Sequence, residues 1–379
     1  MPRLIFKLFV SFFALLLLVF STTNSVYAQD QNQQPLVPPS QEEISTAKIV
    51  EVLEEGEKEI VGNKYPYQIV KVKFLDGSEK DRETTLDHGK KFSISRNQTV
   101  EEGQKVVVIK SSIEGIGTEY HIIDKYRLDK VIAIVLAFFV LVVGLARLKG
   151  LGSIVGLVIS LAVIVKLIVP QILAGRDPLV VSIAGSFVIM ISTIYLAHGF
   201  SKRTTIAVSS TLVTLIFSGI LSLIFVNLSQ LTGGGSEDAY SLRFGQTSNI
   251  NLKGLLLGGM IIGSLGVLDD ITTSLVATIS EIAKSNPKLK FAQLAKSGYR
   301  VGVEHITSLV NTLVLAYAGV ALPIFLFIVL NPTKQPLWFI LNSEFLAEEV
   351  IRTMAGSFGL LLAVPITTIS AAWYFSRKK

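Results

Sequence analysis

Long apolar runs separated by short polar segments fill the chain beyond residue 128, and this pattern predicts membrane-spanning helices. Each run has about 20 residues, the number that a helix needs to cross a hydrocarbon core of roughly 30 Å. We expect seven helices, at residues 129–147, 152–173, 179–199, 205–228, 254–277, 304–330 and 353–375. Together they predict a polytopic α-helical membrane domain over residues 129–379.

Before residue 129 the pattern changes to short strands. Segments such as YQIVKVKFLDG and QKVVVIKSSI are rich in β-branched residues, alternate in part, and are separated by Gly, Asn and Asp turns. They predict a small all-β domain over residues 46–128, either an OB-like barrel or a sandwich. We interpret its two lone histidines, His88 and His121, as surface residues or internally satisfied ones.

The first apolar run has the form of an export signal. Arg3 and Lys7 precede FVSFFALLLLVF, and Val26 and Ala28 fit an A-x-A-like cleavage site. We predict a signal peptide at residues 1–28, or an uncleaved anchor over the same residues. A Pro- and Gln-rich linker follows at residues 29–45. Either form of the first segment places the β-domain on the extracytoplasmic side.

Composition and charge agree with this orientation. The mean hydropathy is +0.55, and the net charge is +6. With the β-domain outside, the cytoplasmic loops and C-terminus hold twelve basic residues and the opposite loops hold six, as the positive-inside rule requires. We therefore predict a multi-pass protein of the inner or plasma membrane whose partner is the lipid bilayer and not nucleic acid. Cysteine is absent, which excludes thiolate chemistry, and we expect no cofactor.

The stretch LGVLDDITTS, at residues 265–274, places two adjacent carboxylates in an apolar helix. At 1.5 Å per residue, Asp269 lies roughly 22 Å from the outer end of the run, in the inner half of the bilayer. Asp269 and Thr272 point about 100° away from Asp270 and Thr273. The latter two share a face with a predicted helix-packing seam of small residues, Gly259, Gly263 and Gly266. An intramembrane aspartate costs a few kcal/mol, so it usually faces a cavity or a bound ion.

Other polar residues are predicted to meet this pair in a hydrated cavity open to the cytoplasm. Glu304, Ser308 and Asn311 share one face of the sixth predicted helix, with His305 beside them, and His198 ends the third helix. The predicted ion or substrate site comprises Asp269, Asp270, Thr273, Glu304 and Asn311, with secondary contributions from His198, His305, Thr272 and Ser308.

Structural interpretations of these residues stay open. If the helix ends early, Asp269 or Asp270 becomes the N-cap of ITTSLVATISEIA. Asn311 is of a type that often bridges two membrane helices, and His198 and His305 lie near the interface, where structural roles are common. An enzyme is disfavoured, because no metal-binding spacing occurs and the adjacent aspartates point to two faces.

At these residues the chain resembles the YibE/F family of bacterial membrane proteins. The resemblance rests on LGVLDDITTSLVATISEI and SGYRVGVEHITSLVNTLVLAYAGVALP, with further matches at 124–157, 169–186 and 198–204. It extends from about residue 46 to 375 and implies an exported β-domain followed by a multi-helix membrane domain. Many members are expected to carry a single aspartate after the glycine-rich segment, and an Arg-Asp pair where this chain has Val303 and Glu304. The resemblance implies no substrate.

Two functions follow as hypotheses. The first is a transporter or permease-like protein in which the aspartates bind a small coupling ion or a cationic substrate. The second is a non-catalytic scaffold or sensor whose external β-domain binds a ligand or an envelope protein. Transport requires water to reach the face of Asp270, whereas a scaffold allows that face to be dry.

Overall fold

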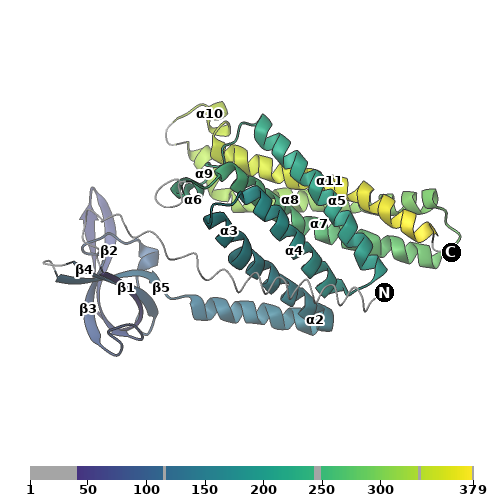
Figure 1. Cartoon of the computed structure of the whole chain (residues 1–379). Helices are drawn as coiled ribbons and strands as arrows, with labels where there is room; N and C mark the ends of the chain where they lie inside the picture. Colours follow the sequence, from purple (N-terminus) through teal and green to yellow (C-terminus); the bar gives the residue numbers. More distant parts are fainter. Residues whose placement is uncertain (1–40, 114–116, 243–248, 332–333, 378–379) are drawn as a thin grey trace. The chain divides into compact units, whose positions relative to one another are not determined.

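The computed structural model describes residues 41–113, 117–242, 249–331 and 334–377. They form two compact units that divide between Leu141 and Val142, one built of strands and one of helices (Figure 1). The predicted signal peptide, and the predicted linker up to residue 40, lie outside the described residues.

The first unit is one antiparallel sheet with the strand order β3-β2-β1-β4-β5. β1 pairs with β4 from Gln41 to Lys48 and with β2 from Ala47 onward, and register shifts near Ile49 and Val52 follow the change of partner. The two edge strands also contact each other, so the sheet curves until its edges approach. The strands are β1 (Gln41–Ile60), β2 (Asn63–Phe74), β3 (Glu83–His88), β4 (Lys105–Ile113) and β5 (Gly117–Lys125).

Period-two alternation determines which side chains of the sheet are buried. Val70 and Val72 on β2, and Val106 and Val108 on β4, have no exposed surface, while their strand neighbours are at least partly exposed. His88 is buried, and its Nε2 lies 3.0 Å from the carbonyl oxygen of Gln98, in agreement with an internally satisfied histidine.

One boundary of the β-domain was predicted too late. β1 begins at Gln41, so the last five residues of the predicted linker, 41–45, belong to the sheet. The segment QEEIS lacks the composition of a strand, but it is held by pairing with β4, in which Ile44 lies opposite Ile109. Long-range pairing therefore overrides the local sequence preference here.

The helical unit contains six helices, among the described residues, that are long and apolar enough to cross a membrane. The first of these stretches, Leu128–Leu173, contains a non-helical residue, Arg147, with φ 52° and ψ −130°. The elements are α2 (Leu128–Val163, which spans the division between the units), the π-helical turn η3 (Ile164–Ile168), α3 (Val169–Leu173), α4 (Pro178–His198), α5 (Lys202–Leu228), α6 (Glu237–Ser241), α7 (Leu252–Ser285), α8 (Phe291–Val320), α9 (Leu322–Leu330), α10 (Leu337–Leu341) and α11 (Glu344–Arg377).

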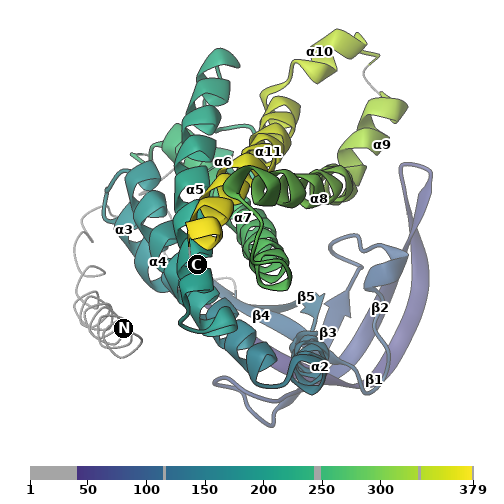
Figure 2. The same ribbon diagram turned by 90° about the vertical axis from the view of Figure 1, so that its right-hand side faces the viewer.

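Helices α4, α5, α7 and α11 form the core of this unit (Figure 2). In an apolar 18-residue stretch of α7, and likewise of α11, 56% of the residues are buried, against 6% in α8. Helices α7 and α11 are therefore central, and α8 is peripheral. Leu268, Ile271 and Leu275 of α7 and Leu360 of α11 are almost completely buried.

The sixth predicted helix differs most from the structure. It was expected at residues 304–330, but α8 begins at Phe291 and α9 starts after a break at Ala321, beside Pro323. The extra turns at the start of α8 pack on the bundle, because Leu294 is buried and Gly298 lies against Ile279. Tertiary packing therefore extends a helix whose first turns are rich in lysine and polar residues.

A partly buried ionic cluster supports the curved sheet. Lys110 Nζ lies 2.7 Å from Glu79 Oε1, the Tyr120 hydroxyl donates to the same oxygen at 2.7 Å, and Arg82 lies 3.1 Å from it. Burial raises the pKa of Glu79, but the hydrogen bonds from Lys110 and Tyr120 outweigh it, and the pKa lies below its usual value. The carboxylate therefore ties β4 and β5 to the segment between β2 and β3.

We predict that Glu79→Gln destabilises the sheet by about 1–2 kcal/mol at neutral pH, since a charged acceptor of three donors is lost. Because the folded pKa of Glu79 is lowered, its contribution is fully present above the unfolded pKa of about 4.3 and is lost as the pH falls through the folded value. Hydrogen exchange of the β4 and β5 amides in the full-length protein measures this. Glu59→Gln, an exposed change in the β1–β2 hairpin, is the control, and equal protection in both variants would contradict the prediction.

Candidate functional site

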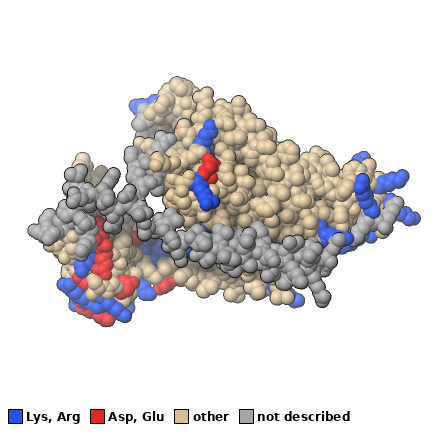
Figure 3. All heavy atoms as spheres, viewed as in Figure 1, with Lys and Arg blue, Asp and Glu red and all other residues tan. Residues whose placement is uncertain are grey.

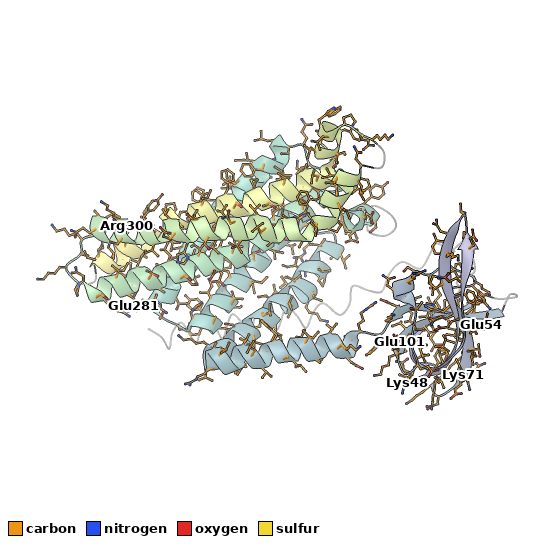
Figure 4. All side chains as sticks on the ribbon, turned by 180° about the vertical axis from the view of Figure 1, so that it is seen from behind. Lys48, Glu54, Lys71, Glu101, Glu281 and Arg300 are labelled. Atoms are coloured by element: carbon orange, nitrogen blue, oxygen red, sulfur yellow. The ribbon has the colours of Figure 1, made fainter. Side chains whose placement is uncertain are left out.

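A cavity of about 210 Å³ lies between α4, α5 and α7, near the end of the helical unit where the C-terminus lies. Basic side chains gather at this end of the unit (Figure 3), which we call the basic end. Glu281 on α7 and Arg300 on α8 both lie there (Figure 4). The cavity is lined by His198, Arg203, Thr204, Ala207, Thr273, Ser274 and Ala277.

A tight turn between α4 and α5 positions two of the lining residues. α4 ends at His198 because Gly199 adopts φ 73°, a backbone angle that residues other than glycine rarely adopt. Ser201 then caps α5 by accepting from the backbone N–H of Thr204. The turn therefore places the His198 ring and the side chain of Arg203, in the first turn of α5, beside one cavity.

Asp269 lies in the middle of α7, which runs without interruption from Leu252 to Ser285 and is capped by Asn251. The helix-cap interpretation of the aspartate pair is therefore wrong, since no helix begins at either residue. Thr193 of α4 lies near the Asp269 carboxylate, and the Thr193 hydroxyl donates to the main-chain oxygen of Ile189 at 3.0 Å. Asp269 Oδ1 is buried and has no hydrogen-bond partner among the described residues.

This state of Asp269 is uncommon in the unit. The other buried side-chain atoms without a partner, within the described ranges, are five hydroxyl oxygens and the Nε of Arg352. Arg352 lies 3.5 Å from a carboxylate oxygen of Glu349, and hydroxyls are far cheaper to leave unpaired than a carboxylate. Asp269 is thus the only carboxylate with an unpaired buried oxygen in the part of the chain that the structure describes.

Asp270 and Thr273 follow Asp269 along α7, in the direction of the basic end. Asp270 is exposed and is close enough to His198 for its charge to act on the ring. Thr273 lines the cavity, and its hydroxyl donates to the main-chain oxygen of Asp269 at 2.8 Å. Of the predicted site residues, His198 and Thr273 line one cavity. Asp270 lies near the His198 ring, and Asp269 is one helical turn before Thr273.

Thr272 has a packing role instead. It is completely buried, and its hydroxyl lies 2.6 Å from that of Thr211 on α5. Thr214 and Ser222, on the same face of α5 as Thr211, donate to main-chain oxygens one turn back, at 2.8 Å each. All three are buried in the packing of α5 against its neighbours, and none of them lines the cavity.

The predicted contribution of α8 is not observed. Glu304, Ser308 and Asn311 are exposed and His305 is only partly buried, and none of them lines the cavity described above. Close packing of α8 is confined to its first half, where Gly298 and Gly302 lie against Ile279 and Val364. Beyond that half, most of its residues are exposed or only partly buried.

The predicted glycine seam is also not a packing surface in this structure. Gly259, Gly263 and Gly266 are exposed, and near their Cα positions only the tips of Arg352 and Tyr317 approach the first two. The closely packed glycine of α7 is Gly258, where any side chain would collide with Ser182. The spacing identified residues that share a face, but the helix packs through a different face.

The opposite end of the unit contains a cluster that the sequence analysis missed. Glu344 accepts from the backbone N–H groups of Thr232 and Gly233, and Glu348 accepts from that of Gly235 at 2.9 Å. Glu348 is only 4% exposed. Two signals were available in the sequence: acidic residues four positions apart at the start of α11, and the glycine-rich segment TGGG at residues 232–235. Among the described residues no group of three or more His, Asp or Glu side chains could hold a metal ion.

The fold and the site define a class: a helical membrane protein with a carboxylate pair in the middle of a long apolar helix, joined in sequence to a small antiparallel β unit. The chain belongs to the YibE/F family, since the model of the YibE/F-like proteins matches residues 134–377. The match covers the helical unit and leaves out the β unit, so the expected likeness from about residue 46 is shown only from residue 134. No curated protein and no solved structure matches this chain.

We predict that a cysteine replacing Thr273 reacts with a membrane-impermeant maleimide, whereas one replacing Thr272 does not. Thr273 lines the cavity and Thr272 is fully buried, and the native chain has no cysteine. Thiols react as thiolates, so labelling reports water at that position. Labelling of the full-length protein in membrane vesicles measures the difference. No reaction at position 273 would show that the cavity is closed or dry, and equal reaction at both positions would contradict the prediction that only position 273 is accessible.

Proposed function

We propose that this protein is a transporter or permease-like protein in which Asp269 and Asp270 bind a small coupling ion or a cationic substrate. The observation that supports this most strongly is the unpaired, buried Oδ1 of Asp269. A carboxylate in hydrocarbon costs a few kcal/mol, and leaving one of its oxygens without a partner adds about 1–3 kcal/mol. An ion, a proton or a water at that oxygen offsets the cost.

The cavity supplies a route to this carboxylate. A solute that enters between His198 and Thr273 reaches a residue one helical turn from Asp269, because Thr273 bonds to the main-chain oxygen of Asp269. Asp270 stands beside the route, near His198. The hydroxyl oxygen of Thr193, near the Asp269 carboxylate, offers a further oxygen ligand, the type of ligand that hard cations prefer.

Topology and orientation form part of the proposal. The stretch Leu128–Leu173 has 46 residues and would measure about 69 Å as one helix, more than twice the hydrocarbon thickness. Its interruption at Arg147 therefore supports two crossings and seven in total. We place the basic end in the cytoplasm of a bacterial cell by the positive-inside rule, and the β unit, exported by a signal peptide, outside the cell membrane.

The strand order and the contact between β3 and β5 support an OB-like barrel for that β unit. Such a barrel suits the competing proposal, in which the external domain binds a ligand or an envelope protein and the helices act as a scaffold. This second function needs neither the cavity nor the unpaired carboxylate.

We predict that full-length protein in liposomes on a solid-supported membrane gives a transient current when the Na⁺ or H⁺ concentration is raised, and that Asp269→Asn reduces this current at least tenfold. The amide keeps the shape of the side chain but removes its charge, so it no longer binds a cation. The current measures charge movement on ion binding and does not require the substrate to be known.

Asp238→Asn is the matched control, because it makes the same chemical change at an exposed position of α6. The control is expected to keep the wild-type current. No current from the wild type with either cation, or an unchanged current in Asp269→Asn, would remove the transport proposal and favour the scaffold.

A further inference from the structure

Three side chains that line the cavity have hydrogen-bond donors with no acceptor in the described part of the chain. Arg203 makes no hydrogen bond or ion pair there, although its guanidinium has five N–H groups. The ring of His198 and the hydroxyl of Ser274 are likewise without a partner among the described residues. They come from α5, α4 and α7 respectively and meet at one cavity, so the donors approach it from three sides.

The acidic residues near Arg203 do not neutralise it. Glu281 is close enough for the charge of Arg203 to act on it, but its carboxylate is already paired with Lys284 at 2.7 Å. Arg203 and Lys149 both act on His198, opposed there by Asp270, which does not line the cavity. Two cationic side chains against one carboxylate leave the surroundings of the ring with an excess of positive charge.

The start of helix α5 adds to this positive charge around the cavity. Arg203 and Thr204 lie in the first turn of α5, where the helix dipole favours an anion. The Thr204 hydroxyl is 2.8 Å from the Ser201 hydroxyl, and the Thr273 hydroxyl donates to the main-chain oxygen of Asp269. The donors left for a ligand are therefore those of Arg203, His198 and Ser274.

We infer that this cavity binds a phosphate group, held by the guanidinium of Arg203 with Ser274 and His198 as further donors. Arginine binds phosphate through two parallel N–H···O bonds. Donors on three sides suit the tetrahedral oxygens of a phosphate better than the planar pair of a carboxylate. The cavity of about 210 Å³ admits a free phosphate ion or the phosphate of a lipid headgroup.

This inference goes beyond the ion site at Asp269. Binding of the phosphate group stands on the cavity alone, whereas its role as a transported substrate rests on the proposed function. If both hold, the cation at the aspartates and the anion at Arg203 bind within one connected region and reduce each other's electrostatic cost.

Isothermal titration of the purified full-length protein in a neutral detergent, with inorganic phosphate as the titrant, tests the first source. Wild type is expected to bind, and Arg203→Gln to bind at least about tenfold more weakly, which corresponds to the loss of a charge-assisted hydrogen-bonded pair. Arg203→Lys should fall between the two, since it keeps the charge and loses the fork. Lys202→Gln removes the same charge at the adjacent exposed position and should bind as wild type does.

Native mass spectrometry of the same proteins taken from phosphatidylglycerol vesicles tests the lipid source. Retention of the lipid by wild type and Lys202→Gln, and its loss from Arg203→Gln, would assign the site to a headgroup. If Arg203→Gln does not fold, Ser274→Ala takes its place, with a smaller loss expected.

Absence of both inorganic phosphate and lipid from wild type, or binding that Arg203→Gln and Lys202→Gln weaken equally, would overturn the inference. Its failure is distinguishable from that of the transport proposal. Phosphate binding without a cation-induced current leaves the anion site standing, and a current without phosphate binding leaves only the ion site.

Discussion

The hydrocarbon core offers no water to a polar group, so every polar side chain of the helical unit has to find its partner inside the protein. Most of them do. Thr214 and Ser222 donate to the main chain of their own helix, and Thr211 and Thr272 lie close enough to share a hydrogen bond between α5 and α7. A few buried hydroxyls stay unpaired among the described residues, but Asp269 Oδ1 is the one buried carboxylate oxygen there without a partner. Because an unpaired carboxylate is far more costly than an unpaired hydroxyl, it is the feature of the unit that calls for a chemical function.

Two neighbouring threonines show how the unit separates packing from access. Thr272 is completely buried against α5, whereas Thr273, one position later, faces the cavity. A rotation of about 100° per residue is enough for a single helix to serve the core on one side and the cavity on another. Asp269 as a whole is half-buried, but its Oδ1 is buried and shielded from solvent.

Much of the architecture was predictable because it depends on local pattern. The apolar runs and the alternating strands correspond to helices and strands of the structure. Two of the predicted site residues, His198 and Thr273, line one cavity. What the pattern could not supply is which face of a helix packs. Gly259 and Gly258 are adjacent in sequence, yet only Gly258 is enclosed. The exposure of Glu304 and Asn311 depends on where α8 leaves the bundle. Arg203 entered the sequence analysis only as one of the basic loop residues, although its place beside the cavity makes it a candidate for binding an anion.

A structure of the full-length protein in a lipid nanodisc by electron cryomicroscopy, at a resolution that shows ordered water, tests the central claim most directly. We expect density for a water or an ion within hydrogen-bonding distance of Asp269 Oδ1, connected to the cavity beside Thr273. If Oδ1 is instead paired with another side chain of the protein and the cavity is filled by the chain, Asp269 is a structural residue and the account is contradicted.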